Sequence, residues 1–305
     1  MVPEYIVGYD GTEPSRAALE FTRVLARQTG AEVVAAYVYA TLTSLYVSPF
    51  GFAAPSELYA EAAQDGRVAA ERLLEPLPAG IGRRAVPSGS VPMELHGLAR
   101  DDHAALLAVG ATHRGTLGRL VPGSIAERLL HGSPCAVLVV AQDARLGPIE
   151  TIAVAYDGRR ESRHALRAAE ALALCSGASL RLIAAIDPWP AGIDLPRGID
   201  ELDEAFGNHI DDVLEHAASG LRTRGFEVET HAERAAPGPA VVRCCEHGVD
   251  LLVTGSRGYG PLRTVLLGGA SRHIVDHAPC PVLVIPRGVS TTLVSDDVVA
   301  ALSAA

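Results

Sequence analysis

The sequence contains two similar copies in tandem, and this duplication limits the possible fold more than any other feature. The segment YIVGYDGTEPSRAAL at residues 5–19 returns as IAVAYDGRRESRHAL at 152–166, an offset of 147. A second segment, at 109–140, returns at 254–285 with an offset of 145. Because both recur in the same order at nearly the same spacing, each copy forms one structural unit. A length of 305 residues also suits two domains of about 150 residues each.

We therefore expect two domains, residues 1–142 and 150–287, followed by a C-terminal tail at 288–305. The join near 142–150 is polar and contains a glycine–proline pair, which favours a short linker. The tail ends in VVAALSAA, an apolar pattern with helical spacing that fits either a short docking helix or a disordered end.

Within each copy, short apolar runs alternate with longer helical patterns. Runs such as ALLAV and AVLVV lack apolar–polar alternation, which is typical of parallel strands covered on both faces. The helical stretches 13–28 and 160–176 each end before a glycine, a common stop signal. This order predicts an α/β protein with a doubly wound, five-stranded parallel sheet in each copy, and a ligand crevice at the carboxyl ends of the strands. The expected strands are 5–9, 32–38, 81–86, 104–109 and 135–140, then 151–155, 179–185, 226–231, 250–254 and 281–285.

Composition excludes several classes of protein. No run of 18 or more apolar residues occurs, which argues against a membrane span. The net charge of -10, without a basic stripe, argues against nucleic acid as a partner. The stretch Met1–Tyr9 has no leader pattern, so we expect a cytoplasmic protein. Five cysteines without a CxxC pair indicate reduced thiols packed as small apolar side chains.

The strongest chemical signal follows the fourth strand of each copy. In the second copy, the strand VDLLVT meets Gly255 and Gly258, then nine residues, then Gly268 at an expected helix start. Glycines let the backbone approach a ligand closely, and the N–H groups at a helix start favour a phosphate. This outline is neither a Walker A loop nor a GxGxxG fingerprint.

The spacing GxxGx9G followed by Ser or Thr, in a domain whose first strand ends at an aspartate, resembles the ATP-binding universal stress proteins. The resemblance covers both copies but not the tail. It implies two Rossmann-like domains that bind ATP, with or without Mg²⁺. In that family the strand-1 aspartate contacts adenosine, while the glycine loop and its hydroxyl residue hold ribose and phosphates. The candidate nucleotide-binding positions are Asp10, Val38, Gly110, His113, Gly123 and Ser124 in the first copy, and Asp157, Gly255, Gly258, Gly268 and Gly269 in the second.

Each copy departs from the family pattern once. His113 replaces the second glycine of the first copy, and its side chain could either crowd the ligand or donate a hydrogen bond to it. Gly269 replaces the hydroxyl residue of the second copy, with Ser271 two residues later. Losing that hydroxyl removes one hydrogen bond, about 0.5–1.5 kcal/mol, and leaves the backbone N–H in place. We expect nucleotide in both copies.

Simpler interpretations stand beside these. The glycine loops could be turns that bind nothing, and Asp10 and Asp157 could simply cap the next helix, as Ser15 and Ser162 do. The pair His273 and His277 has metal-ligand spacing without a third ligand, which favours surface histidines. The loop arginines could pair with phosphates or simply be solvated at the surface; they are Arg114, Arg119, Arg257 and Arg263. The aromatic residues after the second strands could cover an adenine or pack within their loops; they are Tyr39, Tyr46, Phe50, Phe52 and Trp189.

The leading hypothesis is an ATP-binding, nucleotide-responsive regulatory protein in stress adaptation, acting on an unidentified protein partner. One alternative is a slow adenine-nucleotide hydrolase, for which no metal-holding carboxylate or water-orienting group can be assigned. The other is a scaffold without ligand, in which the copies form a pseudo-dimer. In this family the last strand commonly pairs across the domain interface. Left unpaired, AVLVV and PVLVI would be exposed apolar edges, so an internal pseudo-dimer and a further homodimer both fit.

Overall fold

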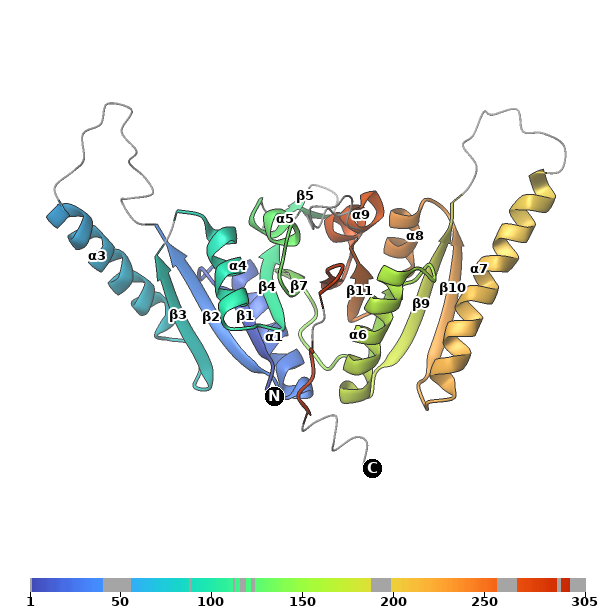
Figure 1. Ribbon diagram of the computed structural model, residues 1–305, viewed down its shortest axis with the longest axis horizontal. Coiled ribbons are helices and arrows are strands. Elements are labelled where there is room, and N and C mark those ends of the chain that lie inside the picture. The colour runs from blue at the N-terminus through green and yellow to red at the C-terminus, as the bar shows by residue number, and fades with distance from the viewer. Residues whose placement is uncertain are drawn as a thin grey trace.

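The computed structural model places the two copies side by side in one mixed α/β molecule (Figure 1). It describes residues 2–40, 56–87, 89–111, 113–115, 119–121, 124–187, 199–256, 268–289 and 292–296.

Strands and helices alternate in the first copy as the sequence predicts, and the strand positions agree within two residues. A short antiparallel hairpin, β5–β6, stands between β4 and α5 and was not predicted. The elements are β1 (Glu4–Gly8), α1 (Glu13–Thr29), β2 (Glu32–Tyr39), α3 (Ser56–Leu74), β3 (Ile81–Pro87), α4 (Val91–Asp101), β4 (Leu106–Ala111), β5 (His113–Gly115), β6 (Arg119–Val121), α5 (Ser124–Leu130) and β7 (Ala136–Ala141).

The second copy repeats this order. Its first helix ends at Gly177 with a left-handed φ of 73°, as α1 ends at Gly30 with 69°, so both predicted stops are confirmed. The elements are β8 (Thr151–Ala155), α6 (Arg160–Ser176), β9 (Ser179–Ile186), α7 (Ile199–Arg222), β10 (Val228–Arg234), α8 (Pro237–Cys244), β11 (Leu251–Gly255), α9 (Gly269–His277) and β12 (Val282–Ile285).

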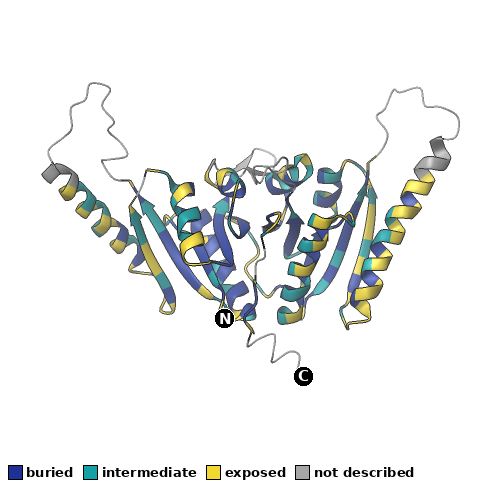
Figure 2. Cartoon of the chain, viewed as in Figure 1, coloured by how far each residue is buried: buried dark blue, intermediate teal, exposed yellow. Residues whose placement is uncertain are grey.

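One ten-stranded sheet runs through both copies in the order β10-β9-β8-β11-β12-β7-β4-β1-β2-β3. Pairing is parallel within each copy and antiparallel between β7 and β12, where Leu138 lies opposite Leu283. The last strands therefore pair inside the chain, and the two most apolar edges cover each other. The outer strands β3 and β10 carry many exposed residues (Figure 2).

Helices cover both faces of the sheet, which explains the uninterrupted apolar runs. On β1, Tyr5 and Val7 point into one core and Ile6 into the other, and all three are fully buried. The first core lies under α1, α3, α6 and α7, and the second under α4, α5, α8 and α9. Among the helices that the structure describes, none is both long and apolar enough to cross a membrane.

The linker and the tail are more firmly attached than their composition indicates. Ile149 in the linker is buried, and the backbone N–H groups of Glu150 and Thr151 donate to the carboxylate of Asp250. In the tail, the Tyr5 hydroxyl donates to the Leu293 carbonyl, and the Ser295 N–H donates to the Thr29 carbonyl at 3.0 Å. The tail thus docks on the first copy, whereas the helical pattern at 298–305 lies outside the described residues.

Candidate functional site

The candidate site of the second copy lies where the strand order reverses. Strand β8 is flanked by β9 on one side and by β11 on the other, all parallel. Loops leaving the carboxyl ends of β8 and β11 therefore diverge to opposite faces of the sheet and leave a crevice between them. Asp157 follows β8 and Gly255 ends β11, so both predicted residues meet at this switch point.

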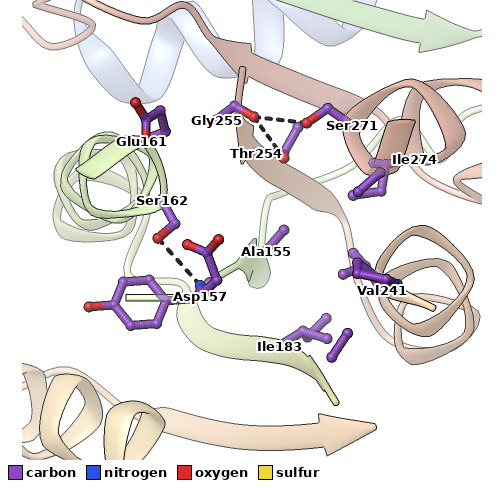
Figure 3. Close-up of a pocket in the computed structure, with 14 residues that line it drawn as sticks. Ala155, Asp157, Glu161, Ser162, Ile183, Val241, Thr254, Gly255, Ser271 and Ile274 are labelled. Carbon is purple, nitrogen blue, oxygen red and sulfur yellow. Dashed lines mark hydrogen bonds between the residues drawn. The ribbon is translucent and has the colours of Figure 1, made fainter. Parts of the chain in front are cut away.

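A cavity of about 120 Å³ occupies the crevice. Figure 3 shows Asp157 and Ser162 on one side, with Gly255 and Ser271 on the other. Asp157 and Gly255 were predicted, but the wall formed by β9 and α8 was not, because Ile183 and Val241 are distant from both motifs in the chain. The further lining residues are Ala155, Tyr156, Glu161, Ile183, Ala185, Pro237, Val241, Thr254, Ala270 and Ile274.

Asp157 begins a tight turn into α6. The Arg159 N–H donates to Oδ1 of Asp157 at 3.0 Å, and the Arg159 Nε lies 3.8 Å from Oδ2. The Asp157 N–H donates in turn to Ser162 Oγ, whose hydroxyl donates to the Arg159 carbonyl. Gly158 has a φ of 71°, a conformation that favours glycine. Ser162, which was expected to cap the helix, is not its N-cap: that position is Arg159, which makes no side-chain capping bond. Ser162 instead bonds back from the first turn of α6 to the turn that Asp157 begins.

The first copy forms the same turn with a different partner. The backbone N–H and the hydroxyl of Thr12 donate to Oδ1 of Asp10, at 3.0 and 2.6 Å, and Ser15 bonds as Ser162 does. Partial burial raises the pKa of Asp10, but these hydrogen bonds to the carboxylate outweigh it, so the pKa is lowered overall.

The glycines at the carboxyl-terminal parts of β4 and β11, Gly110 and Gly255, are required by helix packing. A Cβ on Gly110 would lie 2.3 Å from the Pro14 carbonyl, and one on Gly255 would lie 2.7 Å from the Glu161 carbonyl. The sequence pattern had indicated a ligand close to these glycines. The structure gives them another neighbour, the first turn of α1 or α6.

The start of α9 forms the far wall of the cavity. Gly268 is the N-cap, and as a glycine it supplies no side-chain capping bond to the first N–H groups of the helix. A Cβ on Gly269 would have no atom within 4 Å. The hydroxyl two positions on, Ser271, donates to the Gly255 carbonyl at 2.9 Å and joins the helix start to the strand end.

Glu161 brings a negative charge to the cavity, and a cation partly balances it. Its Oε1 lies 3.3 Å from Nε of Arg287, and the Arg287 N–H donates to Oγ of Ser256. The segment after β12 is thereby attached to the rim of the site. No motif pointed to this pair, because its members are far apart in the sequence.

Several predicted residues are only partly described. Val38 lies near the end of β2, and Ala185, its counterpart at the offset of 147, lines the cavity. His113 lies in β5 and Ser124 begins α5, but their side chains are outside the described part, as are Gly123 and Gly258 entirely. Also outside it are Arg257, Arg263, Tyr46, Phe50, Phe52, Trp189 and the side chains of Arg114 and Arg119.

The weaker candidates have structural explanations. The rings of His273 and His277 stack with centroids 4.0 Å apart, and His277 Nδ1 lies 2.9 Å from the His273 carbonyl oxygen. Within the described ranges, no group of three or more His, Cys, Asp or Glu residues could hold a metal ion. Tyr39 is buried and packs against Gly66 of α3. All five cysteines are free, and burial raises the pKa of Cys135 to about 12.

Comparison with known proteins agrees with the fold. The model of the universal stress protein family matches twice, over residues 3–141 and 148–286. Because the two matches cover most of the chain, the chain belongs to the universal stress protein family.

Individual relatives resemble one copy or both. A universal stress protein of Thermus aquaticus is 30% identical over 138 residues, which is 45% of this chain and 98% of the relative. One of Mycobacterium bovis is 25% identical over 240 residues, or 75% of this chain and 80% of the relative. The crystal structure of a universal stress protein from Archaeoglobus fulgidus aligns over 93% of this chain and 98% of its own, with a TM-score of 0.66 and 21% identity. This last likeness extends the shared fold across both copies.

Proposed function

We propose that this chain is a nucleotide-responsive regulatory protein that binds ATP at the switch point of each copy. The observation that carries the proposal is the cavity between Asp157 and the start of α9. The carboxylate of Asp157 suits a ribose or base, and the apolar wall suits an adenine. The start of α9, which has no side-chain cap from Gly268, suits a phosphate.

The proposed binding mode assigns each wall one part of the nucleotide. Adenosine contacts the side formed by Asp157, Ile183 and Ala185, and the phosphates lie toward the N–H groups at the start of α9. At about 120 Å³ the cavity is smaller than the ~300 Å³ at which small-molecule pockets begin, so part of the nucleotide lies outside it. Arg287 offsets the repulsion between Glu161 and a phosphate.

Regulation is favoured over hydrolysis because the two carboxylates of the cavity already have cationic partners. Asp157 lies beside Arg159, and Glu161 pairs with Arg287. A hydrolase needs a carboxylate that holds Mg²⁺ and a group that orients water at the terminal phosphate. We expect phosphate release from Mg-ATP to stay at the background rate.

Nucleotide analysis and calorimetry test the proposal. Freshly purified protein is denatured and the released small molecules are identified by mass spectrometry, and the stripped protein is then titrated with Mg-ATP. We expect nearly two nucleotides per chain. Asp157→Ala should weaken one binding event about tenfold or more, since a hydrogen bond to a charged group contributes about 1.5–3 kcal/mol.

The control is Asp101→Ala, which removes an exposed carboxylate at the end of α4. It should leave both binding events unchanged. No released nucleotide, together with no uptake of Mg-ATP by the wild-type chain, would contradict the proposal and favour a ligand-free scaffold. One nucleotide per chain that Asp157→Ala does not affect would assign binding to the first copy alone.

A further inference from the structure

A second cavity lies between α6 and the segment that follows β12. It has a volume of about 400 Å³, within the range of about 300–1,000 Å³ typical of small-molecule sites. One wall consists of α6, and the other is formed by Ile285 and residues 288–294, apart from the undescribed 290 and 291. In Figure 1 this segment, in dark red, descends between the two copies.

The segment is fixed in place. Leu293 and Val294 are 3% exposed, and the hydroxyl of Tyr5 donates to the Leu293 carbonyl. The next residue, Ser295, donates its N–H to Thr29 at the end of α1. This wall of the cavity is therefore held by the buried core of the first copy.

The α6 wall is cationic. Arg160, His164 and Arg167 line the cavity at positions i, i+4 and i+7, a spacing that places them on one side of the helix. Among the described residues none of the three has a salt-bridge partner, and no carboxylate lines the cavity with them. The acidic residues of the same helix are paired elsewhere, Glu161 with Arg287 and Glu170 with Arg224.

The remaining wall is apolar. Val289 and Leu293 line the cavity from the segment, Ile285 from the end of β12, and Ala168 and Ala171 from the helix. Grouped cations on one side and apolar side chains on the other suit an amphipathic anion. In a chain with a net charge of -10, three basic residues grouped without carboxylates are also unlike the general surface.

The first copy does not repeat this arrangement. At the offset of 147, Arg160, His164 and Arg167 correspond to Glu13, Ala17 and Glu20 of α1. The positive charge is therefore a property of the second copy alone and is not required by the shared fold.

We propose that this cavity is a second binding site, separate from the switch-point cavity, for a phosphate monoester that carries an apolar group. The phosphate dianion lies against Arg160, His164 and Arg167, and the apolar group lies against Val289 and Leu293. Arginine forms paired hydrogen bonds to phosphate oxygens, which explains two arginines on that wall.

Calorimetry of the full-length chain with phenyl phosphate, and separately with inorganic phosphate, tests the proposal. Phenyl phosphate should bind saturably and more tightly than inorganic phosphate. The double variant Arg160→Glu, Arg167→Glu gives α6 the acidic residues of α1, and binding should weaken by about tenfold for each arginine lost. Glutamate at the first position of a helix is favourable, so the fold should persist, which circular dichroism checks.

Two controls locate the site. Arg163→Glu reverses an exposed charge on the same helix outside the cavity lining and should change the affinity by less than about twofold, because solvent screens it. Asp157→Ala should leave phenyl phosphate binding intact, which separates this site from the proposed nucleotide site. The milder pair Arg160→Ala, Arg167→Ala repeats the test if the charge-reversed chain does not fold.

Three results would overturn the proposal. These are equal affinity for phenyl phosphate and inorganic phosphate, unchanged binding after both arginines are replaced, and loss of binding in Asp157→Ala. Absence of binding to the wild-type chain at millimolar phenyl phosphate would also reject it, without bearing on the nucleotide site.

Discussion

The two copies build the same turn at the switch point and surround it with different side chains. In both, an aspartate follows the first strand and precedes a glycine with positive φ, and its N–H donates to the hydroxyl oxygen of a serine five residues later. The neighbouring residues differ. Relative to the first copy, the second has Arg159 for Thr12, Glu161 for Pro14, Val241 for His96 and Ser271 for Ala126.

This comparison separates residues that the fold requires from residues that a ligand would contact. The shared aspartate, glycine and serine shape the backbone, so their presence in both copies is explained without any ligand. The differing positions include three that line the switch-point cavity of the second copy, Glu161, Val241 and Ser271. Differences in binding between the copies are therefore expected from these positions.

The largest effect is expected where strand and helix approach most closely. Gly110→Ala places a Cβ 2.3 Å from the Pro14 carbonyl, and Gly255→Ala places one 2.7 Å from the Glu161 carbonyl. Each should lower the free energy of unfolding by about 1–3 kcal/mol or more, with Gly110→Ala the more damaging. Urea denaturation measures both. The control is Gly220→Ala in α7, where an added Cβ would meet no atom within 4 Å. This substitution should stabilise the chain by about 0.5–1 kcal/mol, because glycine is unfavourable inside a helix.

If Gly255→Ala proved as stable as the wild type, helix packing would not explain why residue 255 is a glycine. The original explanation, that the glycine lets a ligand approach the backbone, would then be favoured.

The next largest loss of stability is expected where the tail docks on Tyr5, a residue without a tyrosine counterpart in the second copy. Tyr5 corresponds to Ile152 in the second copy, and its buried hydroxyl contacts Thr29 and Leu293. Tyr5→Phe should cost about 1–3 kcal/mol, because it leaves the buried Leu293 carbonyl without its donor. Hydrogen exchange should show faster exchange at Ser295, while β8 in the second copy keeps its protection. Unchanged exchange at Ser295 would show that the tail is held by apolar packing alone.

A smaller effect is expected from Asp10, in the dependence of stability on pH. The lowered pKa of Asp10 means that the unfolded chain binds this proton more readily than the folded chain. The resulting stability is present above the unfolded pKa of about 3.9 and is lost as pH falls through the folded pKa. Asp10→Asn should therefore lower stability at neutral pH and flatten its decline in acid. Because Asp10 is exposed, the effect should stay below about 1 kcal/mol.

Thermal unfolding between pH 7 and pH 3 measures this change. Thr12→Val removes the hydroxyl that donates to Asp10 and should reproduce part of the pH-dependent loss of stability. If Asp10→Asn instead lowered the stability equally at every pH, the charge of the carboxylate would not be involved.

The smallest effect lies between the copies. Nη2 of Arg272 on α9 is 2.6 Å from Oε1 of Glu127 on α5, and both side chains are substantially exposed. Exposed pairs of this kind contribute about 0.2–1 kcal/mol. A double-mutant cycle with Arg272→Ala and Glu127→Ala should give a coupling energy in that range that falls at high salt. A larger coupling that resists salt would mean that this pair helps to hold the copies together.

Local patterns were sufficient to predict most of the fold. The apolar runs located all ten strands of the main sheet, and the glycines after α1 and α6 marked where those helices stop. The internal pairing of β7 with β12 agrees with the expectation for two apolar last strands.

The sequence could not reveal features that depend on distant neighbours. The β5–β6 hairpin is short and lies beside α9 of the other copy, so no local pattern indicated it. The contact of Arg287 with Glu161 joins residues far apart in the chain. At Gly110 the sequence indicated a close approach but not what approaches, because a helix turn and a ligand place the same demand on the strand.

The pairing of β7 with β12 has a consequence for how this molecule can evolve. When two identical chains associate, every substitution appears in both halves, so neither half can change alone. Here the two halves are joined in one chain, and each position varies separately. An arginine can therefore replace an acidic residue on α6 while α1 keeps its glutamate, and a single gene can encode two unequal partners.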